Sequence, residues 1–143
     1  MIAKMSELFE VDVEELQRVL HAIDITTDEL KELLESRNYL ETEIVKEVHH
    51  LRDLNRDLNE VYNIIEIKAE RYRPNNAILH NYLKNIKDLL QKLKFLIEGV
   101  YHNYYYAPNY IKGQLYPDTF TIKSYVEEIL NLVNSAIRRG AFM

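Results

Sequence analysis

Hydrophobic residues recur three and four positions apart along most of the chain, and this spacing places them on one face of a helix. The pattern covers four segments, at about residues 11–23, 27–72, 74–106 and 118–139. Glycine and proline, three of each among 143 residues, leave few places where the chain can turn. The sequence therefore predicts an all-α fold with a single helical domain over residues 1–143.

The third segment has the most regular apolar pattern. Its apolar residues step alternately by four and three positions, as in a coiled-coil seam, and are Leu79, Leu83, Ile86, Leu90, Leu93, Ile97, Val100 and Tyr104. The second half of the 27–72 segment carries a matching seam, with Asn55 at one core position. Because the connection around Pro74 is short, we expect an antiparallel hairpin in which residue i faces about residue 147 − i. The predicted architecture is a four-helix bundle built on this long antiparallel coiled-coil hairpin.

Breakers and capping residues predict where the helices begin and end. Residues 24–27 interrupt the first apolar pattern, and Thr26, followed three positions later by Glu29, has the form of a capping box that begins the second helix. Pro74 suits the first turn of the third helix, where a missing N–H costs nothing. Gly140, directly after two arginines, is a stop signal for the last helix.

The segment lengths predict an overhang in the second helix. At 1.5 Å per residue, the 27–72 segment spans roughly 69 Å and the third segment roughly 48 Å. About residues 27–40 therefore extend past the partner helix, unless the chain bends near 36–38. The apolar residues there need cover from the other helices or from a second copy of the chain, so we expect a homo-oligomer, with a dimer favoured.

Charge is distributed unevenly around a formal net value of −5. Residues 1–67 hold 7 basic and 17 acidic side chains, whereas residues 68–112 hold 8 and 3. This favours pairing of an acidic second helix with a basic third helix inside one chain. The absence of cysteine excludes disulfides and thiolate metal sites, and we expect no cofactor. Without a long apolar run or a visible secretory signal, we expect a cytoplasmic protein with no membrane partner.

Arg73, His80 and Tyr82 form the one stretch with a catalytic pattern. The order of Arg, six spacers, His, one spacer and Tyr resembles the motif of HEPN ribonucleases, small helical proteins that cleave RNA as dimers. The resemblance implies that His80 is a general acid or base, that Arg73 stabilises developing phosphate charge and that Tyr82 orients the site. The structural alternative is that Arg73 ends one helix while His80 and Tyr82 flank the seam of the next.

Four residues with metal-binding side chains fall at one level of the predicted hairpin, namely Glu47 and His50 on the second helix and Glu98 and His102 on the third. Carboxylate and imidazole groups from facing helices build metal sites in helical bundles. The coiled-coil register points most of these side chains away from the seam, and a second Glu-x-x-His motif is missing. We therefore favour solvated charged residues and predict no metal.

A tyrosine-rich run is the least ordinary feature of the sequence. Six of the eleven tyrosines lie within sixteen residues, at positions 101, 104, 105, 106, 110 and 116. Tyrosine offers a large amphipathic surface at low entropy cost, which suits a protein interface. Tyr104 occupies a seam position, and we assign partner binding to Tyr105, Tyr106, Tyr110 and Tyr116. Packing of the loop onto the bundle and stacking of nucleic-acid bases are the alternatives.

The sequence thus favours a non-catalytic assembly or adaptor protein that works through self-association and its tyrosine-rich surface. Neither a glycine-rich phosphate loop nor a Gly-x-Ser-x-Gly elbow is present, which disfavours an enzyme. Scarce Gly and abundant Ile, Tyr, Asn and Lys suggest a viral or mobile-element origin. One alternative is the dimeric ribonuclease. The other is nucleic-acid binding along the basic third helix, through Lys84, Lys87, Lys92 and Lys94.

Overall fold

Four long helices and one helical turn make up the structure, a computed structural model that describes residues 5–36, 38–72 and 76–142, with residues 5–8 and 72 described by their backbone. The elements are α1 (Met5–Glu35), α2 (Glu41–Tyr72), α3 (Ala77–Tyr106), α4 (Tyr110–Gly113) and α5 (Leu115–Arg138). These described residues contain no strand, so the all-α prediction is confirmed.

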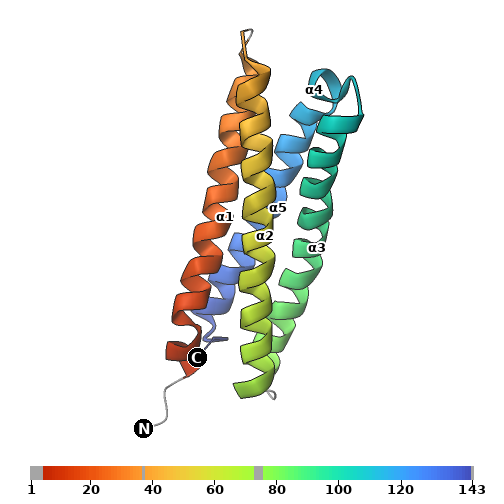
Figure 1. Ribbon diagram of the computed structural model, residues 1–143. Coiled ribbons are helices and arrows are strands. Elements are labelled where there is room, and N and C mark those ends of the chain that lie inside the picture. Colours follow the sequence, from red (N-terminus) through yellow and green to blue (C-terminus); the bar gives the residue numbers. More distant parts are fainter. Residues whose placement is uncertain (1–4, 37, 73–75, 143) are drawn as a thin grey trace.

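The long helices run side by side, and each is antiparallel to the long helix before it in the chain (Figure 1). α1 packs against α2 and α5, and α3 packs against the same two helices, while the short α4 rests on α5 and the end of α3. The α1–α2 pair has the most extensive contact, although the sequence pattern emphasised α2 and α3. Every long helix therefore has two long neighbours and one face turned to solvent.

The apolar seam of α3 lies in the core, as its spacing predicts. All seven of its aliphatic members are buried, from Leu79 to Val100. On α2 the matching positions from Ile44 to Ala69 are buried too, and Asn55 at the core position is 5% exposed. The Tyr62 hydroxyl of α2 donates to the Leu83 carbonyl of α3 at 2.8 Å, which ties the two seams together.

The first helix is longer than the sequence pattern predicts, and the expected break at residues 24–27 is wrong. α1 continues through these residues to Glu35 because both threonines are buried with partners. The Thr27 hydroxyl donates to the Ile23 carbonyl at 2.6 Å, and the Thr26 hydroxyl hydrogen-bonds His50 Nδ1 of α2 at 3.2 Å. Residues that favour a cap are thus accommodated within a helix by local and tertiary hydrogen bonds.

The predicted helix over 27–72 is divided between two elements, which removes the overhang. α1 ends at Glu35 and α2 begins at Glu41, around the expected bend at 36–38, of which Arg37 lies outside the described residues. Leu30 is fully buried, and Leu33, Leu34 and Tyr39 are partly buried. One chain therefore covers most of this apolar surface itself and leaves Leu40 exposed, so no long overhang remains to require a dimer.

Smaller differences occur at the remaining helix ends. α3 begins at Ala77, where the Leu79 amide donates to the side chain of Asn76 at 3.1 Å, and Pro74 lies outside the described residues. α4 was not predicted, and α5 begins at Leu115 rather than near 118. Gly140 ends α5 as expected, with a φ of 68° that favours glycine.

Leucine substitutions test whether one chain covers residues 27–40. Leu30→Ala removes a fully buried side chain and should lower the free energy of unfolding by about 2–5 kcal/mol. Leu40→Ala removes a side chain that is 61% exposed and should change it by less than about 0.5 kcal/mol. Urea unfolding followed by circular dichroism measures both values. Equal effects would contradict the packing of the second half of α1.

Candidate protein-binding face

An aromatic cluster joins α2 and α3 near the end that carries α4. The ring of His49 lies edge-on to the rings of Tyr101 and Tyr105, with centroids 5.4 and 6.0 Å away. His49 Nε2 and the Tyr105 hydroxyl are 2.6 Å apart, and Arg52 Nη1 donates to the Tyr101 hydroxyl at 2.9 Å. The Arg52 guanidinium also lies 4.7 Å from the centre of the Tyr101 ring. These rings contact one another and a cation, so the cluster joins α2 to α3 at the surface.

A second aromatic group lies on the outward face of α3. Phe95 is 70% exposed and Tyr106 is 76% exposed, and the Tyr106 ring packs on His102 at a centroid distance of 4.8 Å. Gly99 is on the same face because it follows Phe95 by four residues and precedes His102 by three. A Cβ atom placed on Gly99 meets no atom within 4 Å. We call Phe95, Gly99, His102 and Tyr106 the α3 stripe.

Three of the four tyrosines assigned to partner binding have hydrogen-bond partners within the fold, and Tyr105 is the one bonded to His49. Tyr110 is buried, and its hydroxyl donates to Asp118 at 2.5 Å. Burial and the neighbouring Asp118 carboxylate raise the pKa of Tyr110 well above its usual range. This placement corrects the assignment of Tyr110, whose role is to attach α4 to α5. Tyr116 stays at the surface, with its hydroxyl donating to Glu35 of α1 at 2.8 Å.

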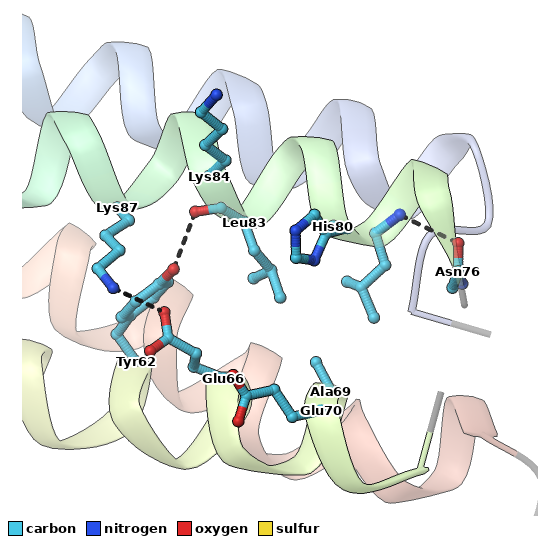
Figure 2. A pocket seen from close by; sticks show the side chains of 10 residues that line it. Tyr62, Glu66, Ala69, Glu70, Asn76, His80, Leu83, Lys84 and Lys87 are labelled. Carbon is cyan, nitrogen blue, oxygen red and sulfur yellow. Dashed lines mark hydrogen bonds and ion pairs between the residues drawn. The ribbon is translucent and has the colours of Figure 1, made fainter. Parts of the chain in front are cut away.

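The ribonuclease-like residues are not gathered into one site among the described residues. His80 lines a cavity of about 330 Å³ between α2 and α3, together with Glu66, Glu70 and Lys87 (Figure 2). Tyr82 is partly buried and does not line that cavity, and Arg73 lies outside the described residues. The Tyr62 hydroxyl near this cavity already donates to the Leu83 carbonyl, and burial raises its pKa well above the usual range. Among the described residues, the cavity therefore brings together His80 but not Tyr82 of the ribonuclease-like motif.

The candidate metal ligands separate in the same way. Glu47 lies beside Glu29 and other residues of a depression between α1 and α2, whereas His50 bonds Thr26. Glu98 and His102 are exposed on α3. Among the residues whose placement is described, no three His, Asp or Glu side chains are grouped to hold a metal ion.

The lysines of α3 do not form one continuous basic track. Lys87 pairs with Glu66 at 3.5 Å, and Lys84 lies by the same cavity. Lys94 lines a separate cavity further along the α2–α3 interface. Lys92 is exposed and precedes Gly99 by seven residues, which puts it on the outward face of α3.

Two features escaped the sequence analysis. Lys123 of α5 lies between Asp24 and Asp28 of α1, at 3.1 and 2.5 Å. Burial opposes its charge, but the hydrogen bonds to both carboxylates prevail and raise the pKa of Lys123. The i, i+4 spacing of the two aspartates was a visible signal for such a pair. Phe95 also escaped, although the seam register places it opposite the buried side of α3.

None of the described helices combines the length and apolar character that crossing a membrane requires. No protein-family model, curated protein or solved structure matches this chain. The functional argument therefore rests on the geometry of the surface.

A pH-dependent effect is expected at Glu47. Burial, with the nearby carboxylate of Glu29, raises the pKa of Glu47 above its ordinary value of 4.5. An acid whose pKa is raised by folding favours the folded state in its protonated form, so its ionisation costs stability as the pH rises through and above 4.5. Glu47→Gln should therefore raise the melting temperature at pH 7 and change it little at pH 4. Thermal unfolding at both pH values measures this difference, and a destabilised variant at pH 7 would contradict it.

Proposed function

We propose that this protein is a non-catalytic assembly or adaptor protein that associates with a second copy of itself through the α3 stripe. In this proposal the scaffold is a four-helix bundle, and its α2–α3 pair forms an antiparallel coiled-coil hairpin. The physical basis of this dimer differs from the predicted overhang, because most of the apolar residues between positions 27 and 40 are buried or partly buried within one chain.

The observation that carries the proposal is a glycine in the middle of an exposed aromatic face. Glycine within a helix costs about 1 kcal/mol relative to alanine. Nothing inside the chain requires this glycine, since an added Cβ meets no atom within 4 Å. Phe95 and Tyr106 on either side expose most of their rings to solvent. Close approach by a second helix accounts for both facts, because it needs a small residue at the crossing and buries the aromatic rings.

The residues flanking Gly99 suit contact with an identical helix. Lys92 and Tyr106 lie seven positions before and after it, so both share its face. When two copies of α3 cross antiparallel at Gly99, Lys92 approaches the partner's Tyr106. An ammonium group over a tyrosine ring is attracted to it, and the two-fold axis forms the contact twice. Two lysines do not meet in this arrangement, which favours a dimer despite the basic character of α3.

Substitutions on the α3 stripe test the proposal. The double variant Phe95→Ser, Tyr106→Ser should weaken self-association by roughly tenfold or more, since exposed aromatic side chains commonly dominate interface energies. Gly99→Leu should do the same without weakening the monomer, because leucine is the better helix former. Light scattering coupled to size exclusion over a concentration range gives the dissociation constants.

Ile67→Ser is the matched control, because Ile67 is 62% exposed on α2 and lies outside the stripe. Its self-association should equal that of the natural protein. A monomeric natural protein at all concentrations, or stripe variants that dimerise unchanged, would refute the proposal.

A further inference from the structure

The cavity that His80 lines has an apolar floor and a polar edge (Figure 2). Its volume is about 330 Å³, and it lies between the last turns of α2 and the first turns of α3. The floor consists of Ala69, Leu79 and Leu83, which are buried, and the edge includes Glu70 and His80, which are exposed.

The cavity forms where the seam of α2 changes from a large side chain to a small one. Ile65 is fully buried in this seam, and four residues later the seam position holds Ala69, whose side chain is a single methyl group. Ala69 is 8% exposed and Leu83 is 7% exposed, whereas their seam neighbours Ile65 and Ile86 are fully buried. The cavity therefore reaches the apolar layer between the two helices. Water finds few hydrogen-bond partners against such a floor, so an apolar guest displaces it favourably.

The charge that is left unpaired at this cavity is negative. Lys87 pairs with Glu66 at 3.5 Å, so these two charges offset each other. Lys84 also lines the cavity, but Figure 2 shows its side chain directed away from the space between the helices. Glu70 is exposed and makes no ion pair with any residue that the structure describes. The cavity therefore presents a carboxylate beside an apolar floor.

We propose that this cavity binds a small primary amine with an apolar tail. The ammonium group pairs with Glu70 at the edge, and the tail lies against Ala69 and Leu83. An ammonium group has three N–H donors and no acceptor. Glu70 accepts from it on α2, and a ring nitrogen of neutral His80 accepts from it on the opposite helix (Figure 2).

The same charges exclude an anionic ligand. A carboxylate or phosphate group in the cavity lies near both Glu66 and Glu70, and like charges repel. The ammonium group of an amine is not opposed in this way, because the charge of Lys87 is already offset by Glu66.

A free amine suits the cavity better than a lysine side chain of another protein, which carries the same ammonium group. A free amine enters with its tail first and leaves its charge at the exposed edge. A lysine side chain is attached to its backbone at the apolar end, so it enters with its charge first. The charge then meets the buried floor, where no polar side chain compensates for the lost water.

The amine site is separate from the proposed dimer contact and does not depend on it. The residues of α3 that line the cavity end at Lys87, whereas the α3 stripe begins at Phe95. Amine binding is measured by nuclear magnetic resonance and dimer formation by light scattering, so either proposal can fail while the other holds.

Titrations of the isotope-labelled full-length protein with small amines test the proposal, with the backbone amide chemical shifts as the readout. n-Hexylamine should bind roughly tenfold or more tightly than n-propylamine, because each buried methylene group strengthens binding about fourfold until the cavity is filled. n-Hexanoate has the same number of carbon atoms and the opposite charge, and it should bind roughly tenfold or more weakly than n-hexylamine. Nα-acetyl-lysine methylamide, which represents a lysine side chain, should also bind roughly tenfold or more weakly.

Two variants remove the two halves of the site. Glu70→Gln removes the carboxylate at an exposed position and should weaken n-hexylamine binding by roughly tenfold or more. Ala69→Leu fills the floor and should weaken binding to a similar extent, while its melting temperature stays level or rises. Glu60→Gln is the matched control, because Glu60 is an exposed glutamate of α2 that does not line this cavity, and it should bind the amine as the natural protein does.

If Ala69→Leu does not fold, Glu70→Gln decides the question. Equal affinities for n-hexylamine and n-propylamine, or n-hexylamine binding that Glu70→Gln leaves undiminished, would overturn the proposal. So would n-hexanoate or the lysine derivative binding as tightly as n-hexylamine.

Discussion

Burial of one apolar seam from each long helix is the interaction on which the rest of the structure depends. On α3 this seam consists of seven aliphatic residues, all buried. Full burial of a single aliphatic side chain contributes about 1.5–3 kcal/mol, whereas an exposed ion pair contributes about 1 kcal/mol or less. The buried seams therefore fix which side of each helix turns inward. Residues outside these seams are not needed to pack the helices together. The exposed rings of Phe95 and Tyr106 are therefore the basis of the functional proposal.

Polar contacts join the helices in addition to this apolar packing. Lys123 joins α5 to two aspartates of α1, and Tyr110 joins α4 to Asp118. Thr26 and His50 connect α1 to α2 by a hydrogen bond. In each of these contacts the polar groups are paired with one another, and the contact holds two helices together. Three buried side-chain atoms, Glu47 Oε2, Arg52 Nε and Asn55 Oδ1, have no hydrogen-bond partner among the described residues.

The sequence predicted the core better than the helix ends or the site. The α3 seam was predictable because its four-and-three spacing persists from Leu79 to Val100. The break expected at 24–27 is absent because the hydrogen bond between Thr26 and His50 joins residues far apart in sequence, which local propensity does not reveal. The burial of Tyr110 was not predicted for a related reason, because it depends on how α4 folds onto α5. In the sequence, Phe95 is one of many apolar residues, and only the register of α3 shows that it lies on the exposed side of the helix.

The central claim is that two copies of α3 cross antiparallel at Gly99, and distances between spin labels test it most directly. Because the chain has no cysteine, Glu98→Cys and Asn81→Cys each provide a single labelling site per copy. Helices in contact lie about 8–10 Å apart, so labels at position 98 should be separated by less than about 25 Å. Labels at position 81 should be about 50 Å apart, since each lies 18 residues from the crossing. Absence of dipolar coupling at position 98, or a shorter distance at position 81 than at 98, would contradict the claim.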